Sequence, residues 1–363
     1  MYESTVSNLL KAKYKDAVQC IIVFYFIHFL LICFFWRGYI KKRWLNEGDN
    51  NVKDNQASFT AMTVAYMRAY HSIHATQKIF NDFLAYELIP EEKRALIEQH
   101  LIEQNMIWDQ QLNDFPYTEL QSEQTITQEL LRQATSRLEG FFNSRARYAE
   151  DALKKAIKKG VKQYVILGAG MDTFAFRQPE MMEKLEVFEI DHPATQDFKL
   201  HRHAELGWKH PAKLHFIPID FTKESLITAL TSSSSYDQTV KTFFNWLGVT
   251  YFLTRDEVFT TFRSIREIAP ANSTIVFDYL DTDAFIPEKS SPQMQKSLEY
   301  LRKIGEPMIT GFNPSTLGDE LTCLGFSLKE NLSSEDIEER YFQGRTDGYH
   351  AYEYGHFACA VVE

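Results

Sequence analysis

Apolar residues change their spacing several times along the chain, and each spacing predicts a different structure. Residues 17–36 are twenty consecutive positions of which only Gln19 and His28 are not apolar. At about 1.5 Å of rise per residue, a helix of this length spans about 30 Å, the thickness of a bilayer core. We therefore expect a transmembrane helix at residues 17–36, within an N-terminal segment 1–43 that is followed by a polar linker at residues 44–57.

Basic residues flank this apolar segment more strongly on its C-terminal side. The positive-inside rule then favours a membrane-anchored protein whose catalytic part is cytosolic. A cleaved signal peptide fits poorly, because the apolar run is long and no small-residue cleavage site ends it. Two alternatives stay open: a buried hydrophobic helix, or a start codon assigned too far upstream, which would leave a cytoplasmic protein. The basic residues after the segment are Arg37, Lys41, Lys42 and Arg43.

Residues 58–160 have the three- and four-residue apolar spacing of amphipathic helices. The spacing runs as far as Gly140, and a shorter helix is expected to follow. Lys158 and Lys159 stand in its last turn and Gly160 just beyond, which are typical helix-ending residues. The pattern predicts a helical cap over residues 58–160.

Beyond Gly160 the apolar residues come in short runs that are separated by helical stretches. Strands that alternate with helices predict an α/β domain at residues 161–363, with a mainly parallel sheet covered on both faces. The last two runs could form an antiparallel addition to that sheet. The predicted strands are Gln163–Leu167, Leu185–Ile190, Leu214–Ile219, Thr242–Trp246, Ser273–Tyr279, Phe326–Lys329 and His356–Val362.

Composition then excludes several classes of protein. Hydrophobic residues make up 44% of the chain and charged residues 24%, which excludes collagen, low-complexity disorder and a polytopic membrane protein. The formal net charge is −10, so a nucleic-acid partner is not expected. The chain has four cysteines, with neither a disulfide framework nor a metal-binding spacing, so no metal site is expected.

The residues that carry chemistry begin where the first predicted strand ends. The strand runs into Gly168 and Gly170, where the missing side chains allow a sharp turn and the close approach of a ligand. Thr173 stands where a dinucleotide-binding G-x-G-x-x-G motif has its third glycine. The departure weakens a nicotinamide-cofactor interpretation, because that glycine allows close helix–strand packing over a pyrophosphate.

Acidic residues end the next two predicted strands. Glu189 and Asp191 lie on one side of the second strand, with Asp191 at its tip, placed to accept hydrogen bonds from ribose hydroxyls. Asp220 and Phe221 end the third strand and suit an adenine amino group and ring. In this order, the residues predict a nucleoside-binding α/β sheet; the alternative is that they are ordinary turn residues.

From about Ser58 to its end, the chain resembles the leucine carboxyl methyltransferase family, many of whose bacterial members use S-adenosylmethionine. The resemblance implies an α/β fold of the class I methyltransferase type, with a seven-stranded, mostly parallel sheet and an N-terminal helical cap. The matching pieces are TAMTVAYMRAYHSIHATQKIFNDFLA, SRARYAEDAL, LGAGMDTFAFR, VFEIDHP, IPIDF and FNWLGVTYFLT.

The resemblance also implies residue roles. Gly168 and Gly170 would face the methionine part of S-adenosylmethionine and Asp191 its ribose, while Asp220 and Phe221 would contact its adenine.

Two further positions, Arg145 and Leu247, bear on the resemblance to the family. Arg145 matches the family arginine that holds the cofactor carboxylate, a task that suits a guanidinium fork; Arg147 stays open as the alternative. Leu247 departs from the family pattern, because many relatives carry glutamate there. The methyl acceptor, or the way in which the cofactor's amino group is held, is therefore expected to differ from that of these relatives.

The expected activity is O-methylation of a small-molecule or peptide carboxylate, or of a hydroxyl, by in-line displacement. A carboxylate needs no base and a hydroxyl does; His71, His74 and His192 are conceivable bases, but no catalytic residue is assigned. Residues 281–312 and the helical cap are expected to cover the acceptor site. Two alternatives stay open: a nicotinamide-dependent oxidoreductase, and a membrane-tethered, non-catalytic nucleoside-binding protein.

Overall fold

The computed structural model describes residues 57–108, 123–221 and 223–363. The predicted transmembrane helix at residues 17–36 lies outside these ranges. Within them, no helix combines the length and the apolar character that crossing a bilayer requires.

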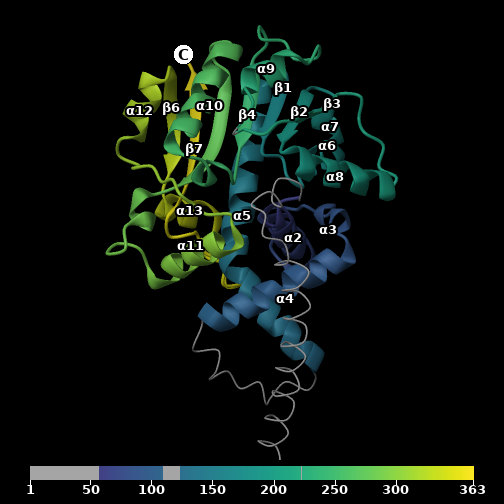
Figure 1. Ribbon diagram of the computed structural model, residues 1–363, viewed down its shortest axis with the longest axis vertical. Coiled ribbons are helices and arrows are strands. Elements are labelled where there is room, and N and C mark those ends of the chain that lie inside the picture. Colours follow the sequence, from purple (N-terminus) through teal and green to yellow (C-terminus); the bar gives the residue numbers. More distant parts are fainter. Residues whose placement is uncertain (1–56, 109–122, 222) are drawn as a thin grey trace, which may run out of the picture. The chain divides into compact units, whose positions relative to one another are not determined.

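A seven-stranded sheet forms the centre of residues 57–363 (Figure 1). Its strand order is β3-β2-β1-β4-β5-β7-β6, in which β7 runs antiparallel to both β5 and β6 and the remaining pairs are parallel. The predicted seven-stranded, mostly parallel sheet is therefore confirmed, as is its antiparallel C-terminal addition. The strands are β1 (Gln163–Leu167), β2 (Glu186–Asp191), β3 (Leu214–Pro218), β4 (Thr242–Trp246), β5 (Thr274–Leu280), β6 (Phe326–Leu332) and β7 (Gly355–Val362).

Helices cover both faces of this sheet, which explains why every residue of β1 and β4 is buried. Successive side chains of a strand point to opposite faces: Val165 and Leu167 join one hydrophobic core, Tyr164 and Ile166 the other. The first core is covered by α9 (Leu226–Thr231), α10 (Arg255–Ile268) and α12 (Leu317–Cys323). The second is covered by α5 (Glu123–Lys158), α6 (Phe174–Arg177), α7 (Pro179–Met182) and α13 (Ser334–Tyr341).

Helix α5 continues through Gly140, so the prediction of a separate shorter helix after that residue was wrong. A Cβ on Gly140 would collide with the carbonyl oxygen of His350. The glycine is needed for the close approach of another backbone segment, not for a helix end. The expected stop is confirmed, because α5 ends at Lys158 and Gly160 has a φ of +94°.

The helical part of the described chain packs around the first half of α5. A third hydrophobic core joins α2, α3, α4 and α5 and includes Tyr66, Leu88, Leu101 and Leu131. The second half of α5 contacts β4, β5 and β7 instead. One continuous helix therefore fixes the cap helices relative to the sheet. The cap helices that precede α5 are α2 (Phe59–His74), α3 (Ala85–Leu88) and α4 (Glu91–Trp108).

A buried ion pair joins the sheet to α8 (Pro193–Glu205). Lys199 Nζ lies 2.5 Å from Glu189 Oε2 on β2, and both side chains are 1% exposed. Burial raises the pKa of the Glu189 carboxyl to about 7, although Lys199 opposes the rise. The folded protein therefore binds this proton more tightly than the unfolded chain does.

This pair predicts a pH dependence of stability. The stabilisation due to the Glu189 proton is complete below the ordinary pKa of 4.5 and is lost as the pH rises through about 7. In urea titrations from about pH 5 to about pH 8, the free energy of unfolding should fall more steeply for the wild type than for the double variant Glu189→Gln/Lys199→Met. Equal slopes for the two proteins would contradict the prediction.

Candidate functional site

One cavity of about 470 Å³ collects the segments that follow four neighbouring parallel strands. The carboxyl ends of parallel strands lie at one edge of a sheet, so these segments meet there. The structure brings all the predicted cofactor-binding residues to the lining of this cavity. They are Arg145, Gly168, Gly170, Asp191, Asp220 and Phe221.

The glycine turn after β1 forms one wall. Gly168 has a φ of +73° and Gly170 a φ of +50°. A Cβ on Gly168 would collide with Val249 Cγ2, and one on Gly170 would lie 3.2 Å from the Cβ of Ala61 in α2. The backbone N–H of Gly168 donates to the carbonyl of Ile190 at 2.9 Å, which ties the turn to β2. Glycine is required here by both conformation and space.

Asp191 lies between the glycine turn and the start of α8. Its carboxylate accepts hydrogen bonds from the backbone N–H groups of Gly170 and, at 2.6 Å, His192. Burial raises the pKa of Asp191, while these two hydrogen bonds lower it. The side chain is therefore held at the cavity wall by two backbone donors.

The third strand contributes an acidic and an aromatic residue side by side. The Asp220 carboxylate lies 2.8 Å from Lys223 Nζ. The Phe221 ring is half-buried against the core that includes Ile219. Both residues line the cavity, as the sequence predicted from their place at the strand end.

The structure separates the two candidate arginines. Arg145 lines the cavity, and its Nη1 donates to Asp278 Oδ2 at 2.7 Å and to Tyr251 Oη at 2.9 Å. Burial opposes the charge of Arg145, but Tyr251 and Asp278 outweigh it and raise the pKa of the guanidinium. Arg147 instead pairs with Asp151 at the surface, where it is 47% exposed. Only Arg145 of the two lines the cavity at the strand ends.

Of the three candidate histidines, the structure places one at the cavity. His192 lines it, and its Nδ1 accepts a hydrogen bond from the N–H of Ala194. His71 is fully buried and accepts a hydrogen bond from the N–H of Ile79, and His74 packs against a tyrosine ring. Neither lines the cavity.

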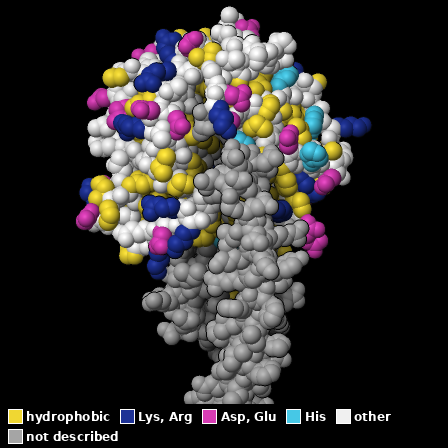
Figure 2. Space-filling view, in the orientation of Figure 1, with side chains coloured by type: hydrophobic (Ala, Val, Ile, Leu, Met, Phe, Trp, Pro, Cys, Tyr) yellow, Lys and Arg dark blue, Asp and Glu magenta, His cyan; other side chains and the backbone are white. Residues whose placement is uncertain are grey.

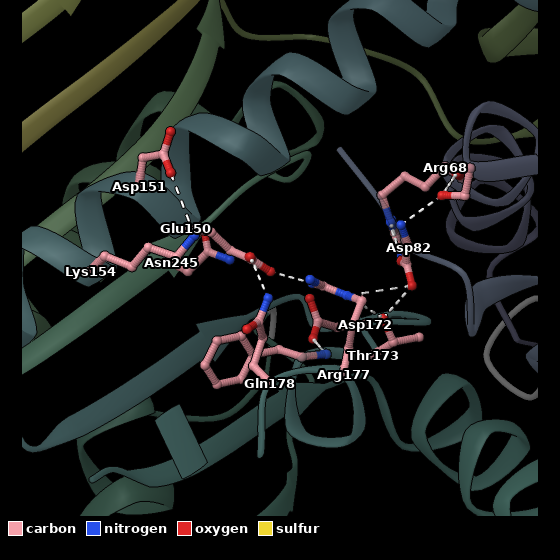
Figure 3. A network of polar contacts seen from close by, with 12 residues as sticks. Arg68, Asp82, Glu150, Asp151, Lys154, Asp172, Thr173, Arg177, Gln178 and Asn245 are labelled. Atoms are coloured by element: carbon pink, nitrogen blue, oxygen red, sulfur yellow. Dashed lines mark hydrogen bonds and ion pairs between the residues drawn. The ribbon is translucent and has the colours of Figure 1, made fainter. Parts of the chain in front are cut away.

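A chain of charged groups joins the cap to the turn after β1, as Figure 3 shows. Asp82 is 1% exposed and lies 2.8 Å from Arg68 Nε of α2 and 3.7 Å from Arg177 Nε of α6. Thr173 also donates to Asp82, and Arg177 donates to Glu150 of α5. Burial raises the pKa of Glu150, and Arg177 opposes the rise. Thr173 thus anchors the cap where a dinucleotide motif would have glycine.

The mouth of the cavity is bounded by two segments that are far apart in the sequence. Gly305, Glu306 and Pro307 follow α11 (Pro292–Ile304) and line it, as does the start of α2. Thr60 donates a hydrogen bond to Glu306, which joins the two segments. Of residues 281–312, which were expected to cover the acceptor site, these three line the cavity; that they cover an acceptor stays a prediction.

Sequence reasoning missed several residues of this site. Asp278 and Asn245 are polar residues inside apolar strands, and that exception to the pattern was the available signal. Arg68 and Asp82 belong to the first segment that resembles the family, but nothing distinguished them there. No local signal marks Glu306, which only the fold brings to α2.

Possible metal ligands and the distribution of surface charge both bear on the class of ligand. Within the part of the chain that the structure describes, no group of three or more His, Cys, Asp or Glu side chains could hold a metal ion. Figure 2 shows basic and acidic side chains interspersed over the described part of the face in view.

One cavity at the end of this sheet collects the glycine turn, the acidic end of β2 and the Asp–Phe pair after β3. This combination is typical of a nucleoside-binding α/β protein. A family model described as leucine carboxyl methyltransferase matches residues 61–266. YktD of Bacillus subtilis, designated an S-adenosyl-L-methionine-dependent methyltransferase, is 35% identical over 311 residues, 85% of this chain and 99% of that protein. The chain belongs to the leucine carboxyl methyltransferase family. The predictions of a methyltransferase and of S-adenosylmethionine as its cofactor are thereby confirmed.

More distant similarities were also found. A relative in Mycobacterium ulcerans with the same designation is 29% identical over 136 residues, 38% of this chain and 44% of that protein. Among solved structures, a DUF574 family protein from Streptomyces avermitilis is 15% identical with a TM-score of 0.48, covering 62% of this chain and 85% of that one. Magnesium protoporphyrin IX methyltransferase of Synechocystis, solved with bound SAH, is 12% identical with a TM-score of 0.38, covering 62% and 86%.

The glycine turn predicts a difference between two alanine substitutions. Gly168→Ala should lower the free energy of unfolding by about 2–4 kcal/mol, because it adds a collision with Val249 to the strain of a left-handed residue. Gly207→Ala is the matched control: its φ is +68°, but a Cβ there meets nothing within 4 Å. It should cost about 1 kcal/mol in the same urea titration. Equal losses would contradict the prediction.

Proposed function

We propose that this protein transfers the methyl group of S-adenosylmethionine to an oxygen atom of a small-molecule or peptide acceptor, either a carboxylate or a hydroxyl. The observation that carries the proposal is the single cavity in which the glycine turn, Asp191 and the pair Asp220 and Phe221 meet at the ends of β1, β2 and β3. The glycine turn suits the methionine part of the cofactor, Asp191 suits its ribose, and Asp220 and Phe221 suit its adenine.

Each of these residues has a proposed contact with the cofactor. Gly168 and Gly170 leave room for its methionine part, and Asp191 accepts hydrogen bonds from its ribose hydroxyls. Asp220 accepts from the adenine amino group, and the Phe221 ring packs beside the base. In support, Asp191 is already oriented by two backbone N–H groups, and glycine is required at position 168.

Arg145 is the proposed partner of the cofactor carboxylate. Its Nη1 is engaged by Asp278 and Tyr251, and its Nη2 is the atom that a Cβ on Gly248 would approach to 2.8 Å. The guanidinium is therefore fixed in orientation at the turn after β4. An arginine held in this way offers its remaining N–H groups to a carboxylate without losing side-chain entropy on binding.

The chain's contribution to the chemistry is binding, orientation and exclusion of water. The bound cofactor supplies a methyl group that its sulfonium already activates, so the protein has to align the acceptor oxygen with it. A carboxylate acceptor is its own nucleophile, whereas a hydroxyl requires a base. The start of α2 and residues 305–307 enclose the cavity over the cofactor residues.

A membrane anchor at residues 17–36 is proposed from the sequence alone. Twenty nearly uninterrupted apolar positions between basic flanks support it. On this proposal the catalytic part is anchored to the membrane from the cytosolic side.

The proposed activity is tested by incubating the protein with methyl-labelled S-adenosylmethionine and a cell extract, and identifying the labelled product by mass. We expect the label on oxygen; alkaline hydrolysis releases it from an ester and leaves it on an ether. Asp191→Ala should bind S-adenosylhomocysteine about 10- to 100-fold more weakly, because a half-buried acceptor of the ribose hydroxyls is lost.

Asp197→Ala is the matched control, because Asp197 lies exposed on α8 and away from the cavity. Its affinity in isothermal titration should equal that of the wild type. Label on nitrogen or carbon would contradict the proposed acceptor. Tight cofactor binding without any labelled product would favour a non-catalytic nucleoside-binding protein.

The anchor proposal predicts the behaviour of the full chain in membranes. After alkaline carbonate treatment of the cell membranes, the full chain should stay in the pellet, because a spanning helix is not released by loss of charge interactions. A variant without residues 1–43, expressed in the same cells, is the control and should appear in the supernatant. Release of the full chain by carbonate would refute the anchor.

A further inference from the structure

The wall of the cavity contains a polar side chain whose hydrogen bonding is incomplete. Asn245 of β4 is 6% exposed, and its Nδ2 donates to Tyr164 Oη at 3.0 Å. Its Oδ1 is buried and has no hydrogen-bond partner among the residues that the structure describes. An unpaired buried amide oxygen costs about 1–3 kcal/mol. Its presence in the wall of a cavity therefore points to a donor on the ligand.

The sheet register places this oxygen beside the methionine side of the proposed cofactor site. Asn245 pairs with Ile166, which is two residues before Gly168 of the glycine turn. Leu247, two residues after Asn245, lines the same cavity but is apolar. Asn245 is therefore the group on this side of β4 that can accept a hydrogen bond.

A carboxylate that forms no ion pair among the described residues, Asp172, lines the same cavity, and Figure 3 shows it near Arg177. Asp172 Oδ1 accepts a hydrogen bond from the N–H of Phe174 at 2.7 Å. Tyr164, Glu150 and Asp172 all line the cavity, and the charges of the two carboxylates add to burial in raising the pKa of the Tyr164 hydroxyl. Glu150 forms an ion pair with Arg177. Asp172 acts on Arg177 only at longer range, so its carboxylate is available to a cation bound in the cavity.

The arginine on α5 completes the arrangement. Arg145 and Ala149 are four residues apart, so they lie on one face of the helix, and both line the cavity. The cavity wall thus offers a guanidinium, from Arg145, and an oxygen acceptor with a carboxylate, from Asn245 and Asp172, which suit the two charged groups of an α-amino acid. We propose that Asn245 Oδ1, together with the Asp172 carboxylate, binds the α-ammonium group of S-adenosylmethionine. This inference rests on the proposed function, because it assumes that the cofactor occupies this cavity.

The test compares two nucleosides that differ in the amino-acid part. S-adenosylhomocysteine carries the ammonium group, and 5′-methylthioadenosine lacks the whole amino-acid end. In isothermal titration, Asn245→Leu should weaken binding of S-adenosylhomocysteine by on the order of 10-fold and leave binding of methylthioadenosine unchanged. Asn245→Asp should bind S-adenosylhomocysteine at least as tightly as the wild type, because it presents a charged acceptor at the same position.

Two further variants keep the test decisive. Asp172→Asn retains the shape of the side chain and the acceptor for Phe174, and should also weaken S-adenosylhomocysteine selectively, even if Asn245→Leu fails to fold. Asn331→Leu is the matched control, because Asn331 accepts a hydrogen bond from Tyr279 outside the cavity. It should bind both ligands as the wild type does.

The possible failures are distinguishable. If the wild type binds neither nucleoside, the proposed cofactor site is wrong and this inference is wrong with it. If the wild type binds both nucleosides, the cofactor site stands and the two site variants decide the ammonium site. Full affinity of these variants for S-adenosylhomocysteine would overturn the ammonium site alone, as would an equal loss of affinity for both ligands.

Discussion

The cavity depends on the buried ion pair between Arg145 of α5 and Asp278 of β5, whose side chains are 6% and 0% exposed. The other oxygen of Asp278 accepts a hydrogen bond from the N–H of Gly248 at 2.6 Å, and a Cβ on Gly248 would crowd the Arg145 guanidinium. One carboxylate therefore fixes the long helix, the fifth strand and the turn after β4 relative to one another. Removing either partner would leave an uncompensated buried charge, which typically costs about 3–5 kcal/mol.

The ion pairs around Asp82 fix the cap helices relative to the turn after β1 in the same way. Near the cavity the cap and the turn after β1 are joined by charged side chains, whereas the hydrophobic cores lie on either side. A wall that must face a polar ligand cannot be apolar throughout, and buried charges are tolerated only in pairs. The position of Thr173 follows from this requirement: its hydroxyl donates to Asp82, so a side chain is needed where a dinucleotide-binding turn has none.

The sheet, and the residues at the strand ends that line the cavity, could be predicted from sequence because both depend on local patterns. Apolar runs buried on both faces marked the strands to within a few residues, and Gly168, Asp191 and Phe221 stand where strands end. The rest depends on contacts between distant segments. Gly140 ends no helix, because the backbone of His350 approaches it. Asp278 is a polar exception in an apolar strand, but only the fold shows that its partner is Arg145. Residues 1–56 and 109–122 lie outside the described structure, so the predicted membrane segment stays a prediction.

The pairing of charges in the cavity wall also bears on how the protein would distinguish cofactor from product. Arg68, Arg145 and Arg177 are each matched by a carboxylate of the protein. Asp172 and Asp191 accept hydrogen bonds from backbone N–H groups and form no ion pair with any of these three arginines. A wall with surplus negative charge attracts a sulfonium more strongly than the neutral thioether that remains after methyl transfer. With the cofactor in this cavity, as we propose, the same carboxylates would favour both binding of the donor and release of the spent cofactor.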